Sequence, residues 1–354
     1  RENSNSRYEY ILPNILFGKV FFSEKFGVID LKSNSLYRNY ETNKHIASIT
    51  NDLIWNPPSF ITGKGFVNSI EGMVKNTNYE AKNTTSYKTE GTINELSGVL
   101  SFKSSRPLQK NDNVFSRIFS PNFMIRYAPG HMRNLRGDGI SLNYANLFST
   151  NKTSVIEDGL SATLGFDYKI NKKNMDGSTN EKLSVSLGQV YNHKRNKNMP
   201  SKSSLHQKTS DIVGEINYNF SKIGKIDYKF SLDENLNDIN YNEIATTLNF
   251  GKVDFNLDFL EERNHIGREH YVKSGISLNL NENNKLGLQT KRNYKTDSTE
   301  FYDISYQYEI DCLTAGLVYR REFYEDSDIE QNNSLMFTIT FVPFAGASAP
   351  ILNQ

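Results

Sequence analysis

Apolar and polar residues alternate along much of this chain, most clearly in its last third. Successive side chains of a β-strand point to opposite faces, so a two-residue period gives a strand one apolar face and one polar face. Three stretches show the period most clearly: Ile226–Asp233, Val253–Phe259 and Leu335–Val342. The pattern therefore predicts strands that separate an apolar environment from an aqueous one.

The same analysis predicts about eighteen strands, joined by segments rich in turn-forming residues. Phe250-Gly251-Lys252 and Asn281-Glu282-Asn283-Asn284 are predicted as tight hairpin turns, and Lys194–Ser210 as a longer polar connection. So many long strands exceed what one sandwich core can bury, which favours closure into a β-barrel. The predicted fold class is all-β, a large antiparallel transmembrane barrel.

The middle of the chain is less regular. Pro121 and Pro129 interrupt it, and Lys103–Phe119 reads as a long polar loop, whereas Ile140–Leu147 is predicted as a strand. Proline lacks the backbone donor of a strand ladder, so it belongs at strand edges or bulges. Residues 1–344 are expected to form the barrel portion and 345–354 a flexible tail.

Composition is consistent with this class. The 354 residues include 41 Lys+Arg and 40 Asp+Glu, and this balance argues against a nucleic-acid binder. The mean hydropathy is −0.60, and no stretch approaches the roughly 18 consecutive apolar residues of a membrane-spanning helix. A barrel strand exposes only one face to lipid and tolerates such polarity.

Motifs for chemistry are weak. There is no nucleophile elbow, phosphate loop or dinucleotide fingerprint, so we expect no enzyme activity, no cofactor and no metal. His265 and His270 are interpreted as solvated loop histidines, and Arg136-Gly137-Asp138 as a chance match to an adhesion tripeptide. Glu261 and Glu262 are adjacent on a strand, so their side chains should point to opposite faces.

Charged residues on the polar faces are the better candidates for function. Asp227, Lys229, Lys291 and Arg320 are predicted to line a hydrated lumen. They either meet an anionic, phosphate-bearing ligand or simply make the lumen wettable. The single cysteine, Cys312, is either a small buried residue or has a disulfide partner on another segment or chain.

Two stretches carry a family resemblance. They are Phe123–Arg133, followed by Leu142–Phe148, and Tyr308–Tyr324, continuing to Leu335–Phe344. Both look like LptD, the outer-membrane protein of lipopolysaccharide assembly, in its alphaproteobacterial form. The opening Tyr8–Pro13 is also similar to the barrel of that family.

The resemblance implies a barrel of about 26 strands in the bacterial outer membrane. The partners it implies are lipopolysaccharide, an LptE-like lipoprotein plug in the lumen, and an LptA-like periplasmic bridge reached through an N-terminal domain. That domain and several strands are expected to precede this chain in a longer precursor. Lipopolysaccharide would leave through a lateral gate, one side of which is the final strand Ser334–Phe344 with Leu335, Phe337, Ile339 and Phe341.

The resemblance also bears on Cys312. It matches the position of a C-terminal cysteine pair that relatives link by disulfide to cysteines near the N-terminus, but here Cys312 is followed by Leu313. At most one such interdomain bridge is then expected. The competing functions are a porin-like channel or plugged receptor, an outer-membrane lipase or protease, and a soluble β-solenoid; irregular strand spacing argues against the solenoid.

Overall fold

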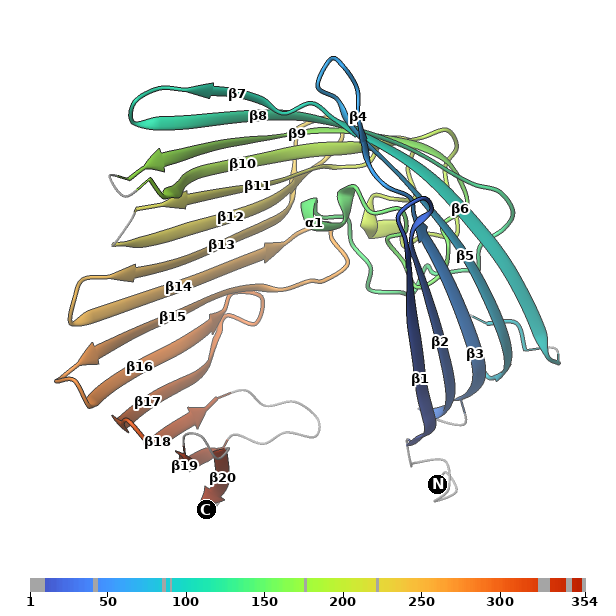
Figure 1. Cartoon of the computed structure of the whole chain (residues 1–354). Coiled ribbons are helices and arrows are strands. Elements are labelled where there is room, and N and C mark those ends of the chain that lie inside the picture. The colour runs from blue at the N-terminus through green and yellow to red at the C-terminus, as the bar shows by residue number, and fades with distance from the viewer. Residues whose placement is uncertain are drawn as a thin grey trace.

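The computed structural model describes residues 10–40, 44–84, 87–89, 91–174, 177–220, 223–323, 332–341 and 346–351. The fold is all-β: the described residues form twenty strands in one antiparallel sheet. Figure 1 shows this sheet curved into the wall of a barrel. The first ten strands are β1 (Tyr10–Ser23), β2 (Gly27–Tyr40), β3 (Lys44–Asn56), β4 (Phe60–Ile61), β5 (Val67–Lys82), β6 (Ile93–Ser105), β7 (Leu108–Asn111), β8 (Phe115–Ala128), β9 (Gly159–Lys173) and β10 (Thr179–Asn192). Most strands pair with their neighbours along the chain, but β3 pairs with β5 and β6 with β8, while the short β4 and β7 pair with β5 and β8.

The second half of the wall is a continuous meander of hairpins. No helix among the described residues is long and apolar enough to cross a membrane. The other strands are β11 (Ile212–Asn219), β12 (Gly224–Leu232), β13 (Ile239–Asn249), β14 (Val253–Glu262), β15 (His270–Asn279), β16 (Asn284–Asn293), β17 (Ser298–Ile310), β18 (Leu313–Glu322), β19 (Asn333–Phe341) and β20 (Gly346–Ile351); the helices are α1 (Tyr144–Leu147) and the 3-10 turn η2 (Ser201–Ser203).

The connections differ at the two ends of the wall. One end carries tight turns, such as the one between β13 and β14 and the one between β15 and β16. The other end carries the long segments 129–158, between β8 and β9, and 193–211, between β10 and β11. In bacterial barrels long loops face outside and short turns face the periplasm. The predicted hairpin turns at Gly251 and Asn281–Asn284 are confirmed.

The sheet has two edges that do not pair with each other in the described residues. β1 pairs with β2, and β20 pairs with β19, but no ladder joins β1 to β20. Figure 1 shows these two strands at opposite ends of the curved sheet. An unpaired edge exposes a row of backbone donors and acceptors, so both edges are ready to pair with another strand.

Several predicted elements need correction. Ile140–Leu147 is not a strand but a loop ending in α1, where Asn143 and Asn146 form a reciprocal capping box. Lys103–Phe119 is not one long loop, because it contains the end of β6, all of β7 and the start of β8. Pro121 falls where β8 changes partner from β7 to β6, a position at which a missing ladder donor costs little.

The C-terminal region also differs from expectation. Within the segment predicted as a flexible tail, Gly346–Ile351 forms β20, because it continues the ladder on the free edge of β19. Pro350 is tolerated there since the outer side of an edge strand makes no ladder bonds. Residues 1–9, residues 342–345 and residues 352–354 lie outside the described residues.

Candidate functional site

The outer face of the wall is apolar. On β8 the outward side chains Phe123, Ile125 and Tyr127 are 37%, 41% and 55% exposed, whereas the alternating Met124 and Arg126 are buried. The same alternation gives β14 an outward row of Val253, Phe255, Leu257 and Phe259. Exposed apolar side chains over so many strands fit a surface that contacts lipid.

The inner face is covered in part by the chain itself. Segments 129–158 and 193–211 fold back against the inside of the wall, and Figure 1 shows α1 within the curve of the sheet. Their apolar side chains form the largest buried cluster of the described residues with two residues of the wall. The cluster contains Met132, Leu135, Leu142, Leu147, Val155, Met199 and Leu205, packed on Val190 of β10 and Val213 of β11. We call these two segments the lumen loops.

Two glycines let α1 approach the wall closely. Gly165 of β9 and Gly188 of β10 are direct partners in the ladder. A Cβ at Gly188 would lie 2.4 Å from Leu147 Cδ2, and one at Gly165 would lie 3.1 Å from Phe148 Cζ. The absence of side chains at both positions therefore creates the depression into which Leu147, fully buried, inserts.

Arg126 ties the first lumen loop to β8. Its guanidinium is 3% exposed and donates hydrogen bonds of 2.6 Å to the carbonyl oxygens of Thr150 and Glu157. Nearby, Tyr144 of α1 donates a 2.7 Å bond to Asp167 of β9, and burial with this bond raises the pKa of the Tyr144 phenol. Buried polar groups with satisfied hydrogen bonds fix the loop in one position.

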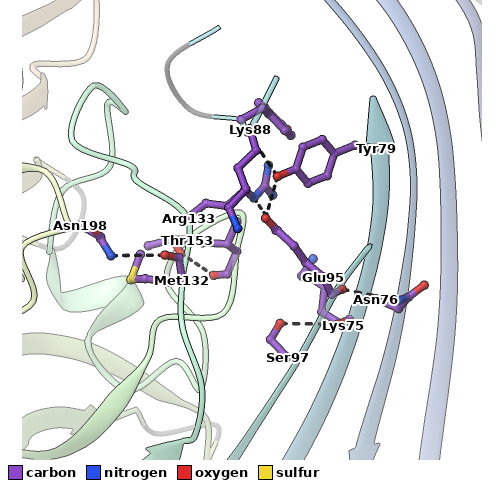
Figure 2. A network of polar contacts seen from close by, with 12 residues as sticks. Lys75, Asn76, Tyr79, Lys88, Glu95, Ser97, Met132, Arg133, Thr153 and Asn198 are labelled. Carbon is purple, nitrogen blue, oxygen red and sulfur yellow. Dashed lines mark hydrogen bonds and ion pairs between the residues drawn. The ribbon is translucent and has the colours of Figure 1, made fainter. Parts of the chain in front are cut away.

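Arg133 makes a second attachment, to the inside of β5 and β6. Its Nε lies 2.9 Å from Glu95 Oε2, an ion pair without hydrogen-bond alignment, and its guanidinium lies 4.2 Å from the Tyr87 ring centroid. Tyr79 donates a 2.8 Å hydrogen bond to the same carboxylate. Figure 2 shows Arg133 among these groups, and shows Asn198 of the second loop bonded to Met132 of the first.

The register identifies which other side chains face the lumen. Glu215 shares the face of Val213, and the ladder pairs Glu215 with Lys229, which in turn pairs with Glu243. Continuing strand by strand, the same face carries Lys291 and the partners Asp303 and Arg320. The four predicted lumen charges, Asp227, Lys229, Lys291 and Arg320, therefore all lie on the inner face by register.

Each of these four charges has an ionic partner. Lys291 Nζ lies 2.7 Å from Glu300, and Arg320 donates two bonds of 2.7 Å to the carboxylate of Asp303. Asp227 lies 2.7 Å from Lys225, and Lys229 lies 3.3 Å from Glu243. Paired and partly exposed charges make a surface wettable without giving it a strong potential of one sign.

The predicted gate residues lie on β19. Leu335, Phe337, Ile339 and Phe341 occupy one face of this strand, as the alternation requires. The strand is not the last of the chain, however, because β20 pairs with it from Leu335 to Thr340. The assumption that β19 forms the edge of the sheet is therefore wrong, and the gate role of its residues stays a prediction.

The other residues singled out from the sequence lie in different parts of the structure. Cys312 is a free, exposed thiol in the tight turn between β17 and β18, so it is not a buried hydrophobe. His265 Nδ1 lies 3.0 Å from Glu262 on the inner face, while Glu261 pairs with Arg263 on the other, which confirms the opposite directions of the two glutamates. The described residues contain no group of three or more side chains suited to hold a metal ion.

The lumen loops do not follow from the strand pattern of the sequence. Lys194–Ser210 is not only a polar connection, and the apolar residues between Met132 and Ile156, for which the pattern predicts no core, belong to a buried cluster. The available signal was the spacing of Met132, Leu135, Leu142 and Leu147 in a segment without strand periodicity. Such residues need apolar surroundings, and a loop in water does not supply them.

A wall with an apolar outer face, a polar inner face and strands long enough to cross a bilayer defines a transmembrane β-barrel protein. Residues 29–270 match the family LptD, described as LPS transport system D, and the chain belongs to this family. Membership places the chain in the outer membrane, in lipopolysaccharide transport, among the Lpt machinery. The family is one of transport proteins and not of enzymes.

Solved structures with a similar fold include porins. A triple mutant of a Rhodopseudomonas blastica porin aligns over 96% of this chain and 93% of its own, with 10% identity and a TM-score of 0.33. Another mutant of the Rh. blastica porin aligns over 73% of this chain and 85% of its own, with 12% identity and a TM-score of 0.35. A comparison with curated proteins finds no match. The assignment therefore rests on the LptD family.

Proposed function

We propose that this chain forms the wall of a translocon that inserts lipopolysaccharide into the outer leaflet of the outer membrane. The observation that carries the proposal is the two-faced wall, polar inside and apolar outside, whose two edges do not pair with each other in the described part of the chain. The charged sugar head of the lipid passes through the hydrated lumen, and the acyl chains leave sideways between strands.

The energetic reason for separating head and acyl chains is desolvation. A polar group without a partner in hydrocarbon costs several kcal/mol, so a lipid with a large charged head does not cross a bilayer unaided. Opening a seam between two strands instead removes ladder bonds worth on the order of 1 kcal/mol each. Nothing in the chain's sequence has a nucleotide-binding motif, so the energy is supplied by the upstream machinery.

The seam is proposed to involve the C-terminal edge of the sheet. β19, with Leu335, Phe337, Ile339 and Phe341 on one face, lies one strand from that edge, and β20 lies on it. Among the described residues, β20 contributes six ladder pairs, fewer than the nine between β18 and β19. A short edge strand separates at lower cost than a long one.

The lumen has room for a further partner along half of its wall. Buried apolar side chains occur from Ile46 to Val213 among the described residues, and strands β14 to β19 carry none. This uncovered surface supports a lumen occupant such as an LptE-like lipoprotein. An LptA-like bridge would act through an N-terminal domain.

Cys312 is proposed to form an interdomain disulfide. Its thiol is exposed in a tight turn at the end of the barrel that faces the periplasm in this class of proteins. It is the single cysteine of the chain, so the partner cysteine must belong to another segment or protein. The oxidising periplasm permits such a bond.

A second candidate is a porin-like channel or plugged receptor. The observation that favours it is the pair of lumen loops, which lie against the inner wall as constricting segments do in channels. A channel of this kind would carry small solutes through the lumen and would need no lateral exit for acyl chains.

The test places a photo-crosslinking amino acid at Phe337 in cells that make lipopolysaccharide. The control position is Ile276 on β15, which also faces outward and is 50% exposed against 36% for Phe337. A lateral exit near β19 predicts lipopolysaccharide adducts at Phe337 well above those at Ile276. Equal adducts at both positions would mean that the lipid merely surrounds the barrel, and would favour the channel.

A further inference from the structure

A pocket of about 540 Å³ lies at the long-loop end of the wall, above β8, β9 and β10. Its inner side is formed by the lumen loops and by the wall residues Arg126 and Val190. Its outer side is formed by Tyr127 and Leu160, outward-facing side chains that are 55% and 41% exposed. The pocket therefore reaches from the lumen loops to the rim of the lipid-contacting face.

The lining carries more positive than negative charge. Five cationic side chains are present against two carboxylates, Glu157 and Asp158. The cations are Arg126, Lys152, Lys194, Arg195 and Lys197. His193 also lines the pocket, so the site has an excess of positive charge whether or not this ring is protonated.

The two carboxylates in the pocket accept hydrogen bonds from amide N–H groups. Glu157 accepts a 2.6 Å bond from the backbone of Lys152, and Asp158 accepts a 2.6 Å bond from the side chain of Asn196. Arg126 and the Lys152 ammonium bond instead to backbone carbonyls. Within the described part of the chain, none of the five cations has a carboxylate in ion-pair contact.

This arrangement differs from that of three cations elsewhere on the inner wall. Lys75, Lys291 and Arg320 each have a carboxylate oxygen within 2.9 Å. Burial lowers the pKa of the Lys152 ammonium. Lys194, Arg195 and Lys197 are exposed at the mouth of the pocket, and a cluster of cations without carboxylate partners favours an anionic ligand with several acceptor oxygens.

We propose that this rim pocket binds a phosphate group on the saccharide head of a lipid in the leaflet around the barrel. The phosphate oxygens contact Lys194, Arg195 and Lys197, and the acyl chains of the lipid lie along Tyr127 and Leu160. The pocket is thus an annular lipid site, separate from the proposed exit near β19. It can exist whether or not the chain transports lipid, so the two proposals fail independently.

The experiment measures lipid binding to the purified full chain in nanodiscs of a zwitterionic phospholipid. The probes are bisphosphorylated lipid A, the same lipid A without phosphates, phosphatidylglycerol and inorganic phosphate as competitor. The variant is Lys194→Ala/Lys197→Ala, both exposed loop residues. The matched control is Lys202→Ala/Lys208→Ala, which removes two positive charges from the same loop outside the pocket.

We expect the pocket variant to lose on the order of tenfold in affinity for bisphosphorylated lipid A, while the control stays near wild type. The affinity of dephosphorylated lipid A should be equally low for the wild-type protein and for the pocket variant. If millimolar inorganic phosphate competes with lipid A, the pocket recognises the phosphate group itself. If inorganic phosphate does not compete, the pocket recognises the phosphate and the sugar together. Both results support the site.

Three results would overturn the proposal. The first is equal loss of affinity in the pocket and control variants, which would indicate a general charge effect. The second is equal binding of lipid A with and without phosphates. The third is phosphatidylglycerol bound as tightly as lipid A, which would remove the saccharide from the proposal. Heat-dependent mobility on gels verifies that each variant is folded before binding is measured.

Discussion

The inner face of the barrel wall is covered by other segments of the chain in one half and not in the other. From β5 to β11 the inner face is covered by the lumen loops, and Leu147, Val190 and Val213 are buried to 2% exposure or less. From β14 to β19 the alternation of faces is the same, but the buried side chains are few and polar, among them Asn293 and Asp303. One half therefore holds a core of its own, whereas the inner face of the other carries ion pairs such as Lys291–Glu300 and Arg320–Asp303.

This difference indicates two functions of the inner face, and the alternation of apolar and polar residues along the strands does not distinguish them. A polar inner face serves equally as a support for folded loops or as the wall of an aqueous passage. The covered half provides attachment through apolar packing, Arg126 and Arg133. The uncovered half presents a wettable surface, which suits a moving saccharide or a lumen partner.

The largest expected effect is at the core under α1. Leu147→Ala removes a fully buried side chain and should destabilise the docking of the lumen loops by about 2–5 kcal/mol. Limited proteolysis within 129–158 should then become much faster, while the barrel retains its heat-dependent mobility on gels. The matched change Leu317→Ala, on the outward face of β18, should leave proteolysis unaltered. Equal effects would contradict a loop core confined to one half.

A smaller effect is expected where Arg133 meets β6. A double-mutant cycle with Arg133→Met and Glu95→Gln should give a coupling of about 1 kcal/mol, because the Arg133 side chain is only 10% exposed and also contacts Tyr87. The readout is the rate of loop opening measured by proteolysis. Additive effects of the two changes would show that the pair does not hold the loop.

The corresponding pair in the uncovered half should be weaker. Arg320 and Asp303 make a two-fold hydrogen-bonded pair, yet Arg320 remains 33% exposed. A cycle with Arg320→Met and Asp303→Asn should therefore give about 0.2–1 kcal/mol in urea unfolding, reduced further by salt. A coupling larger than that of Arg133 and Glu95 would reverse the proposed contrast between the halves.

The smallest effect lies outside both inner faces, in the turn between β7 and β8. Backbone donors of Phe115 and Val114, with Arg117, lower the pKa of Asp112 from 3.8 to about 2. A depressed pKa stabilises the fold above pH 4, and the stabilisation is lost as the pH falls from about 4 to 2. The difference in stability between wild type and Asp112→Asn should shrink over that interval. A difference that is constant with pH would contradict the assignment, and loop proteolysis serves as the control because it should not respond.

Much of the wall was predictable from the sequence. The two-residue period predicted strands at Ile226–Asp233, Val253–Phe259 and Leu335–Val342, and β12, β14 and β19 lie there with the predicted apolar and polar faces. The reason is local: a strand with one apolar and one polar face has only one register that suits lipid and water. The same rule places Asp227, Lys229, Lys291 and Arg320 on the inner face, and their role as lumen charges stays a prediction.

The lumen loops and the C-terminal strand were not predictable in this way. The fold of α1 depends on the depression at Gly165 and Gly188, which belong to strands distant in sequence from Leu147. Likewise, β20 exists because β19 offers a free edge and not because its own residues show a strong period. Residues distant in the sequence determine both the position of α1 and the formation of β20. The periodicity of a segment carries no information about such distant residues.

The central claim is that lipopolysaccharide moves along the uncovered half of the lumen. The most direct test compares photo-crosslinking amino acids at Gln289 of β16 and Ser97 of β6, both on the inner face and both half-buried, in cells that export lipopolysaccharide. If lipopolysaccharide moves along the uncovered half, we expect lipopolysaccharide adducts at Gln289 and few at Ser97. Equal adducts at both positions, or adducts at Ser97 alone, would contradict it.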